Sequence, residues 1–130
     1  MSWYVDSSAL LKLLIVEKES VDLIDFIDFT ITSSVVTRVE VIRTLQKIAP
    51  KKVAEAQILL TGIDLTPVNS SILSVAENFS PSISLKSLDA IHVATVIFLD
   101  KSVEGLVTYD KAMIKNAKEL GIKTISPGIR

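Results

Sequence analysis

Four carboxylate side chains of this 130-residue chain stand in apolar surroundings, where an ionised group is costly unless a partner compensates it. They are Asp6, Glu40, Asp89 and Asp110. Most carboxylates of a folded protein are solvated, so a carboxylate among apolar neighbours is a candidate for chemistry. Carboxylates that meet at one place can hold a divalent cation or transfer a proton.

Asp6 and Asp110 each end a short apolar run that is typical of a strand. Asp6 follows Trp3 to Val5, whereas Asp110 closes the run GLVTYD before a helical segment. In an open α/β sheet, ligands bind at the carboxyl ends of the strands. The alternative for both residues is an ordinary N-cap of the following helix. Thr108, two residues before Asp110, can offer a hydroxyl to whatever Asp110 binds.

Glu40 and Asp89 lie inside predicted helices. Glu40 stands one turn into the helix after the second strand, where its alternative role is a favourable interaction with the helix dipole. Asp89 stands in LKSLDAIHVATVIFL, which is apolar nearly all round, so we favour a functional role over a buried ion pair with Lys86. His92 shares a helical stripe with Asp89, and we interpret it as a hydrogen-bonded core or supporting group, not a catalytic residue.

The elements that must position these residues alternate along the chain. Short apolar runs separated by segments of helical periodicity predict a three-layer α/β/α sandwich around a central, mainly parallel sheet of four to five strands. We predict strands at residues 2–5, 31–35, 63–68, 106–108 and 123–125. We predict helices at residues 8–16, 21–29, 37–48, 53–60, 71–78, 85–99 and 111–120, with stop signals at Pro50, Gly62 and Gly121.

All four acids fall on one rim of this predicted sheet. Like charges crowded there repel one another by on the order of a few kcal/mol per close pair, and a divalent cation is the simplest compensation. Oxygen ligands, a single histidine and the absence of cysteine favour Mg²⁺ or Mn²⁺ over zinc or copper.

The composition, with 48% hydrophobic and 22% charged residues, suits one domain with a buried core. The absence of cysteine excludes disulfides, thiolate zinc sites and a cysteine nucleophile, and it suits a reducing cytosol. The opening segment MSWYVDSSALLKLLIV lacks a basic leading region and carries Asp6, so we expect mature structure and not an export signal. We therefore expect a soluble, cytoplasmic protein.

The formal net charge of −1 gives no global attraction to nucleic acid, so any such binding needs a local basic patch. Basic residues that flank the acids in sequence could form this patch, although ordinary solvated side chains are the alternative: Arg38, Arg43, Lys47, Lys86 and Lys111. Three further acids share one helical face and are interpreted as solvated: Asp22, Asp25 and Asp28.

At its four acids the sequence resembles the PIN-domain family, and especially the small VapC-type toxins of prokaryotic toxin–antitoxin pairs. YVDSSALLKL is similar to the family's opening strand and first acid, and SSVVTRVEVIRTL carries the glutamate. SLDAIHVATV carries the third acid and LVTYDKAMIKNAKELGI the fourth. The resemblance covers essentially the whole chain as a single PIN domain of residues 1–130.

This resemblance implies a metal-dependent endoribonuclease that cuts RNA and leaves 5′ phosphates. Its active site would consist of Asp6, Glu40, Asp89 and Asp110 around one or two Mg²⁺ or Mn²⁺ ions, with Thr108 as the hydroxyl residue before the last acid. The resemblance also implies a homodimer and, for the toxin branch, an antitoxin protein that blocks the site. Candidate contacts to RNA phosphates are Arg38, Arg43, Lys86 and Lys111.

Other functions are compatible with acids on this sheet edge. A phosphatase or phosphotransferase of the haloacid dehalogenase or response-regulator type needs a second acid near the first strand, but Asp6 is followed by Ser7 and Ser8. A nucleotide-binding module would need a glycine-rich phosphate loop, and the chain has only four glycines. A catalytically inactive PIN fold that serves as an interaction module remains an alternative, against which stands the presence of all four acids.

Overall fold

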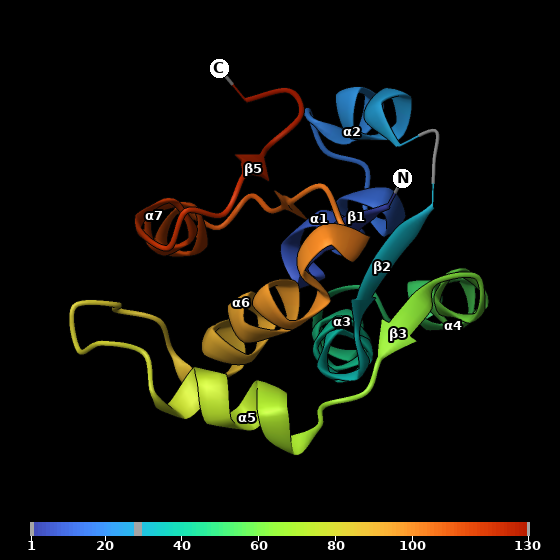
Figure 1. Cartoon of the computed structure of the whole chain (residues 1–130). Helices are drawn as coiled ribbons and strands as arrows, with labels where there is room; N and C mark the ends of the chain where they lie inside the picture. Colours follow the sequence, from blue (N-terminus) through green and yellow to red (C-terminus); the bar gives the residue numbers. More distant parts are fainter. Residues whose placement is uncertain (1, 28–29, 130) are drawn as a thin grey trace.

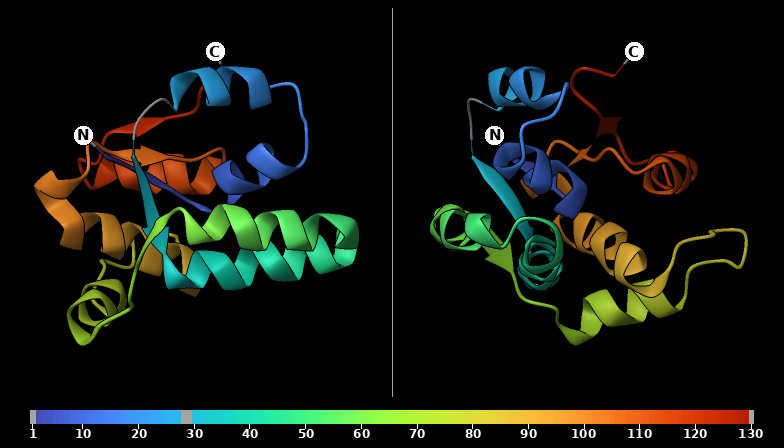
Figure 2. Two further views of the ribbon diagram at one scale, coloured as in Figure 1. Left: turned by 90° about the vertical axis from the view of Figure 1, so that its right-hand side faces the viewer. Right: turned by 180° about the vertical axis from the view of Figure 1, so that it is seen from behind.

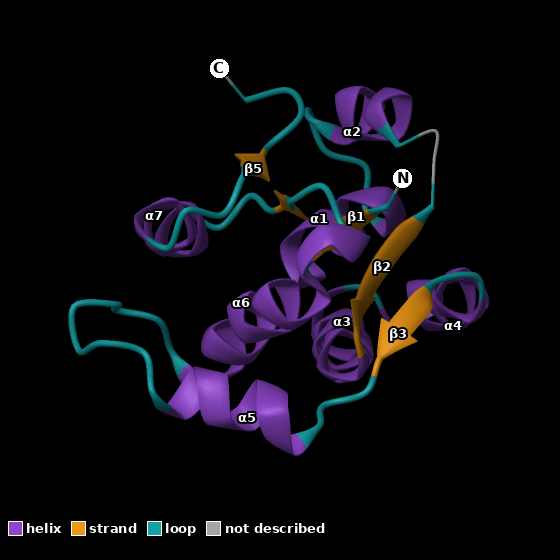
Figure 3. Ribbon diagram, viewed as in Figure 1, coloured by secondary structure: helices purple, strands orange, loops and turns teal. Residues whose placement is uncertain are grey.

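The computed structural model describes residues 2–27 and 30–129, which form a five-stranded, all-parallel sheet (Figures 1 and 3). The strands are β1 (Trp3–Val5), β2 (Ile31–Ser34), β3 (Asp64–Thr66), β4 (Leu106–Val107) and β5 (Thr124–Ile125). Their order is β3-β2-β1-β4-β5, so the first strand is central and the chain reverses direction across the sheet after β3. The predicted fold class is confirmed.

Helices connect the strands and cover both faces of the sheet. They are α1 (Ser7–Leu14), α2 (Ser20–Phe26), α3 (Val35–Ile48), α4 (Val53–Thr61), α5 (Ser70–Glu77), α6 (Ser87–Leu99) and α7 (Lys111–Glu119). Short 3₁₀ turns, Pro50–Lys52 and Asp100–Ser102, follow α3 and α6. Figure 2 shows α3 and α4 lying side by side as an antiparallel pair.

Alternating side chains of the strands feed two separate cores. Trp3 and Val5 of β1 pack with α1 to α4 on one face, whereas Tyr4 packs with α6 and α7 on the other. In β4, Val107 joins the first core and Leu106 the second. Because successive side chains of a strand point to opposite faces, a short strand buried on both sides tends to be apolar throughout, as β1 and β4 are. In β2, which is also buried, the hydroxyls of Thr32 and Ser33 are hydrogen-bonded to backbone carbonyls.

Several predicted boundaries are wrong by a few residues, for local reasons. The second strand ends at Ser34, whose hydroxyl accepts from the Val36 N–H and caps α3, so this helix begins at Val35 and Glu40 lies in its second turn. The sixth helix begins at Ser87 and not at residue 85, because the Lys86 backbone is extended.

The second helix ends at Phe26, and the predicted residues Asp28 and Phe29 lie outside the described residues. The stop signals agree with the structure: α3 ends before Pro50, Gly62 caps α4, and Gly121 adopts a positive φ of 76° after α7. None of the described helices is long and apolar enough to cross a bilayer.

Candidate active site

Asp6 lies directly after the central strand and is almost completely buried, with 3% of its surface exposed. Its Oδ1 accepts hydrogen bonds from the Ser8 hydroxyl at 2.6 Å and from the Ala9 N–H at 3.1 Å, so Asp6 is the N-cap of α1. Burial raises the pKa of the Asp6 carboxyl, against the hydrogen bonds from Ser8 and Thr108 that act to lower it. Asp6 therefore caps α1 and also lies at the carboxyl edge of the sheet.

Thr108 connects Asp6 to Asp110. Its buried hydroxyl donates to Asp6 Oδ2 at 2.5 Å and accepts from the Asp110 N–H at 3.1 Å. The hydroxyl proton is thus used by Asp6, and a role of Thr108 toward a ligand of Asp110 stays a prediction. Ser8 also holds the segment that follows β4, because its hydroxyl accepts a hydrogen bond from the Tyr109 N–H.

Asp110 is exposed at the N-terminus of α7, where its Oδ1 accepts from the Met113 N–H at 2.9 Å. Among the described residues its second carboxylate oxygen has no hydrogen-bond partner. As with Asp6, the N-cap interpretation is correct, and it leaves one oxygen available at the carboxyl edge of the sheet.

Glu40 reaches this edge from α3 and is held by two side chains from other elements. Its Oε1 accepts from the Ser7 hydroxyl at 2.8 Å and lies 2.6 Å from His92 Nε2. Burial acts to raise the pKa of Glu40, but the hydrogen bond and charge of His92, together with Ser7, outweigh burial and leave that pKa below its usual value. Glu40 is therefore a fixed carboxylate and not a loosely solvated first-turn residue.

His92 is fully buried in α6 and is hydrogen-bonded at both ring nitrogens. Its Nδ1 lies 2.7 Å from the Tyr4 hydroxyl, opposite the contact of Nε2 with Glu40. The interpretation of His92 as a hydrogen-bonded supporting group agrees with this geometry.

Asp89 differs from the other three acids because, among the described residues, its carboxylate forms no hydrogen bond and no ion pair. The alternative of an ion pair with Lys86 is therefore wrong. Burial raises the pKa of Asp89, and the charges of Asp110, Glu40 and Asp6 raise it further, against an opposing effect of His92. Asp89 thus lies within electrostatic reach of all three other acids.

The four acids lie near one another at the same edge of the sheet, but they do not form a complete metal-binding site. Within residues 2–27 and 30–129, no three carboxylate or imidazole side chains converge closely enough to surround one metal ion. The candidate phosphate contacts Arg38, Arg43, Lys86 and Lys111 are all exposed, and none of them forms an ion pair with another described residue.

Sequence reasoning missed the residues that hold the acids in place. Besides Tyr4, Ser7 and Ser8, the structure adds Asn116, a buried residue of α7. Its Oδ1 accepts from the Ser84 N–H at 3.0 Å, and its Nδ2 donates to the Ala112 carbonyl at 2.8 Å. Asn116 therefore ties the segment before α6, which carries Asp89, to the helix that Asp110 begins. The DSS run after β1 was the only visible signal for any of these supports.

A parallel α/β/α fold with carboxylates and supporting hydroxyls at the carboxyl edge of its central strands defines the class of open α/β proteins that bind their ligands at this edge of the sheet. Within that class, this chain belongs to the PIN-domain family, whose model matches residues 3–119.

Individual relatives agree with this assignment over nearly the full chain. The chain is 34% identical over 132 residues to a protein named Ribonuclease VapC47 from Mycobacterium tuberculosis, covering 96% of each sequence. The fold is similar to a structure titled as a toxin–antitoxin complex from Klebsiella pneumoniae, with a TM-score of 0.76, 18% identity and coverage of 96% and 97%. It is equally similar to M. tuberculosis VapC20, described as a sarcin–ricin loop cleaving toxin, with a TM-score of 0.76, 13% identity and coverage of 98% and 100%.

Proposed function

We propose that this chain is a metal-dependent endoribonuclease and the toxin component of a VapBC-type toxin–antitoxin pair. The ribonuclease and toxin roles rest on its similarity to VapC ribonucleases over almost the whole sequence. The proposed catalytic residues are Asp6, Glu40, Asp89 and Asp110, with Thr108 in support.

The observation that carries the catalytic proposal is the unpartnered carboxylate of Asp89. Its pKa is raised by burial and by the charges of three other acids, among which it stands without a hydrogen-bond donor or cation of its own. The first turn of α6 favours a negative charge, but burial and the three neighbouring acids oppose one, and no side chain among the described residues compensates fully for them. A bound cation would compensate the repulsion among the acids, because each of the carboxylates is attracted to it.

The donor set fits Mg²⁺ or Mn²⁺ in its chemistry. Carboxylate oxygens are the ligands that these hard cations prefer, and the chain has no cysteine. The lack of a three-residue cage is compatible with Mg²⁺, which usually keeps several of its waters and uses one or two protein carboxylates. Asp89 and the free oxygens of Asp110 and Glu40 would hold it, directly or through water. Such an ion supplies charge for the phosphodiester and a bound water of lowered pKa.

Other side chains of the chain would orient the carboxylates of Asp6 and Glu40. Thr108 and Ser8 fix the orientation of Asp6, so that its carboxylate keeps one direction at the centre of the edge. Ser7 and His92 occupy Oε1 of Glu40 and leave Oε2 to face a ligand or to accept a proton from water.

The partners proposed for this chain are RNA, an antitoxin protein and a second copy of the chain. A relative of known structure is titled as a toxin–antitoxin complex, which supports the antitoxin partner. A cytoplasmic location is proposed because an RNA substrate is found there and because the sequence lacks cysteine.

The test is cleavage of a single-stranded RNA by the purified protein with Mg²⁺ or Mn²⁺, and again in excess EDTA. Wild type should cut only with metal, Asp89→Asn should be inactive, and Asp25→Asn should be fully active. Asp25 is a suitable control because it is an exposed aspartate of α2 and undergoes the same chemical change. Undiminished cleavage in EDTA would refute the metal dependence, and a fully active Asp89→Asn enzyme would refute the assigned site.

A further inference from the structure

A hollow of about 280 Å³ opens directly beside the acidic edge, between α3 and the first turn of α6. Its lining combines a carboxylate of the candidate site with two cations, a hydroxyl and two apolar side chains: Val39, Glu40, Arg43, Thr44, Lys47 and Leu88. Val39 and Leu88 are large apolar residues that remain exposed. The hollow is therefore continuous with the candidate active site through Glu40.

The cations of this hollow are not used by the fold. Glu40 is one helical turn before Arg43, yet its Oε1 is directed to Ser7 and His92. Neither Arg43 nor Lys47 forms an ion pair with any other described residue. The two side chains stand one turn apart on α3, about 6 Å along the helix axis, a separation that successive phosphates of an extended strand can meet.

A second hollow of about 290 Å³ adjoins the first across α3, towards α4. The two share Val39 and Arg43, and the second adds Arg38, Ile42 and Gln57. Figure 1 shows why they meet, since α3 lies between α6 and α4. Together they form a track over α3, defined by the lining residues of both hollows, which contains three cations, three apolar side chains, two uncharged polar side chains and the carboxylate of Glu40.

We propose that this α3 track binds the single-stranded RNA that flanks the cleavage point, with phosphates on Arg38, Arg43 and Lys47 and a base against Val39 and Leu88. The inference rests on the proposed ribonuclease function and adds the path of the substrate. Its basis is charge complementarity, because an RNA strand presents negative phosphates and flat apolar bases in alternation. The track also begins at Glu40, so a strand lying in it enters the site directly.

The test measures binding of a fluorescently labelled 12-nucleotide RNA, by anisotropy at several salt concentrations, in an Asp110→Asn background with Mg²⁺ present. For single strands, the slope of log affinity against log salt changes by about 0.7 per phosphate contact. Arg43→Ala/Lys47→Ala should therefore reduce the slope by about 1.4 and weaken binding on the order of 20-fold at 0.1 M salt. Leu88→Ala should weaken binding several-fold and leave the slope unchanged.

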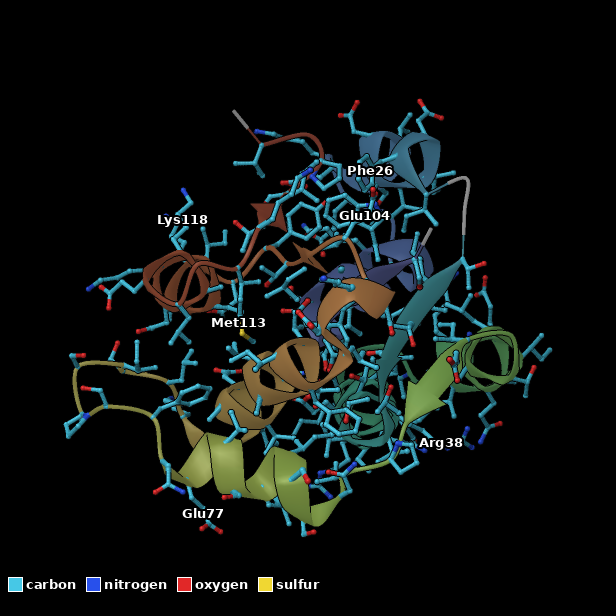
Figure 4. The ribbon with its side chains drawn as sticks, viewed as in Figure 1. Phe26, Arg38, Glu77, Glu104, Met113 and Lys118 are labelled. Carbon is cyan, nitrogen blue, oxygen red and sulfur yellow. The ribbon has the colours of Figure 1, made fainter. Side chains whose placement is uncertain are left out.

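The matched control is Lys101→Ala/Lys118→Ala, which also removes two positive charges from exposed positions. Figure 4 shows that Lys118 of α7 and Arg38 of α3 lie on opposite sides of the molecule. The control pair should bind RNA like the parent.

The outcomes separate the track from the ribonuclease proposal. If wild type cleaves RNA but the Arg43→Ala/Lys47→Ala pair keeps its affinity and slope, the track is wrong and the function stands. An equal loss in the Lys101→Ala/Lys118→Ala pair also overturns the track, since any cation would then serve. If Leu88→Ala changes the oligomeric state and leaves RNA binding intact, the hollow is an interface between copies. If wild type neither binds nor cuts RNA, both proposals fail.

Discussion

The imidazole Nε2 of His92 lies 2.6 Å from Oε1 of Glu40, and this contact joins helices from opposite faces of the sheet. Only 1% of the His92 side chain is exposed, compared with 25% for Glu40. A buried hydrogen-bonded pair of this kind fixes the direction of a carboxylate that is otherwise on a rotatable three-bond stem. Glu40 is therefore oriented by α6 as much as by its own helix.

His92→Leu should disturb Glu40 and the fold together. The change removes the hydrogen bond of 2.7 Å to the buried Tyr4 hydroxyl, which then has only Ser33 and Thr37 to interact with, so the free energy of unfolding should fall by roughly 1–3 kcal/mol. If Glu40 is a metal ligand, as proposed, RNA cleavage should fall by about 10- to 100-fold, the usual cost of removing a residue that orients such a ligand. His92→Gln, which keeps an N–H donor toward Glu40, should recover part of the activity. Denaturant unfolding and initial cleavage rates measure both effects, and wild-type rates in a folded His92→Leu protein would contradict them.

Thr108→Val should uncouple Asp6 from Asp110. The substitution keeps the size of the side chain but removes the hydroxyl that donates to Asp6 Oδ2 and accepts from the Asp110 N–H. Because both partners are then unsatisfied near a buried carboxylate, we expect a loss of roughly 1–3 kcal/mol in stability and lower cleavage at unchanged KM. Thr108→Ser, which retains the hydroxyl, should behave nearly as wild type. Equal rates for the Val and Ser variants would show that the hydroxyl has no role in orienting the acids.

The places of Asp6 and Asp110 in the fold could be predicted because the carboxyl ends of parallel strands share one edge. Each acid follows a short apolar run, and β1 and β4 are hydrogen-bonded neighbours. The same logic explains why the fold class was correct: apolar runs mark strands buried on both faces. Local capping signals account for several boundaries, but the cap at Ser34 was missed, because the predicted strand ran on to residue 35.

The partners of the acids could not be predicted in this way. Glu40 and His92 are 52 residues apart, and helical periodicity says which face of a helix is apolar but not which residue of another helix it meets. Whether Asp89 pairs with Lys86 likewise could not be predicted from their spacing, because Lys86 is the extended N-cap residue of α6 and not part of the helix. Hydroxyl bridges such as Thr108 to Asp6 depend on side-chain rotamers and leave no pattern in the sequence.

Asn116→Leu should loosen the segment that leads into α6. The substitution removes the acceptor of the Ser84 N–H and the donor to the Ala112 carbonyl, both at a buried position. We expect a loss of roughly 1–3 kcal/mol in stability and faster tryptic cleavage after Lys86, because that exposed residue follows the released segment. Asn116→Asp keeps an acceptor for Ser84 and should be less sensitive. Identical digestion of Asn116→Leu and wild type would show that the tie does not restrain the segment.

Expression of the chain alone should slow bacterial growth, and Asp110→Asn should relieve this effect. Asparagine is as good an N-cap as aspartate, so the variant should keep α7 capped while losing the negative charge at the site. Growth curves under matched expression, with Asp25→Asn as the control, measure the difference. Equal growth inhibition by a folded Asp110→Asn protein would point to a cause other than RNA cleavage.

Asp89→Asn should leave the metal-free protein equally or more stable while removing its response to Mg²⁺. In EDTA the folded state raises the pKa of Asp89 above its usual 3.8, so ionisation costs more in the folded than in the unfolded chain. The contribution of the protonated Asp89 carboxyl to the free energy of unfolding is fully present below pH 3.8, where the residue is protonated in both the folded and the unfolded chain. It is lost as the pH rises through the higher pKa of the folded state. Asparagine avoids this loss, so the variant should melt above wild type near pH 7 and match it at low pH. Wild type should gain stability with Mg²⁺, and the variant much less. If Asp89 instead formed an ion pair, Asp89→Asn should lower the free energy of unfolding in EDTA by roughly 3–5 kcal/mol. The variant would then still gain the full increase in stability that Mg²⁺ gives the wild type.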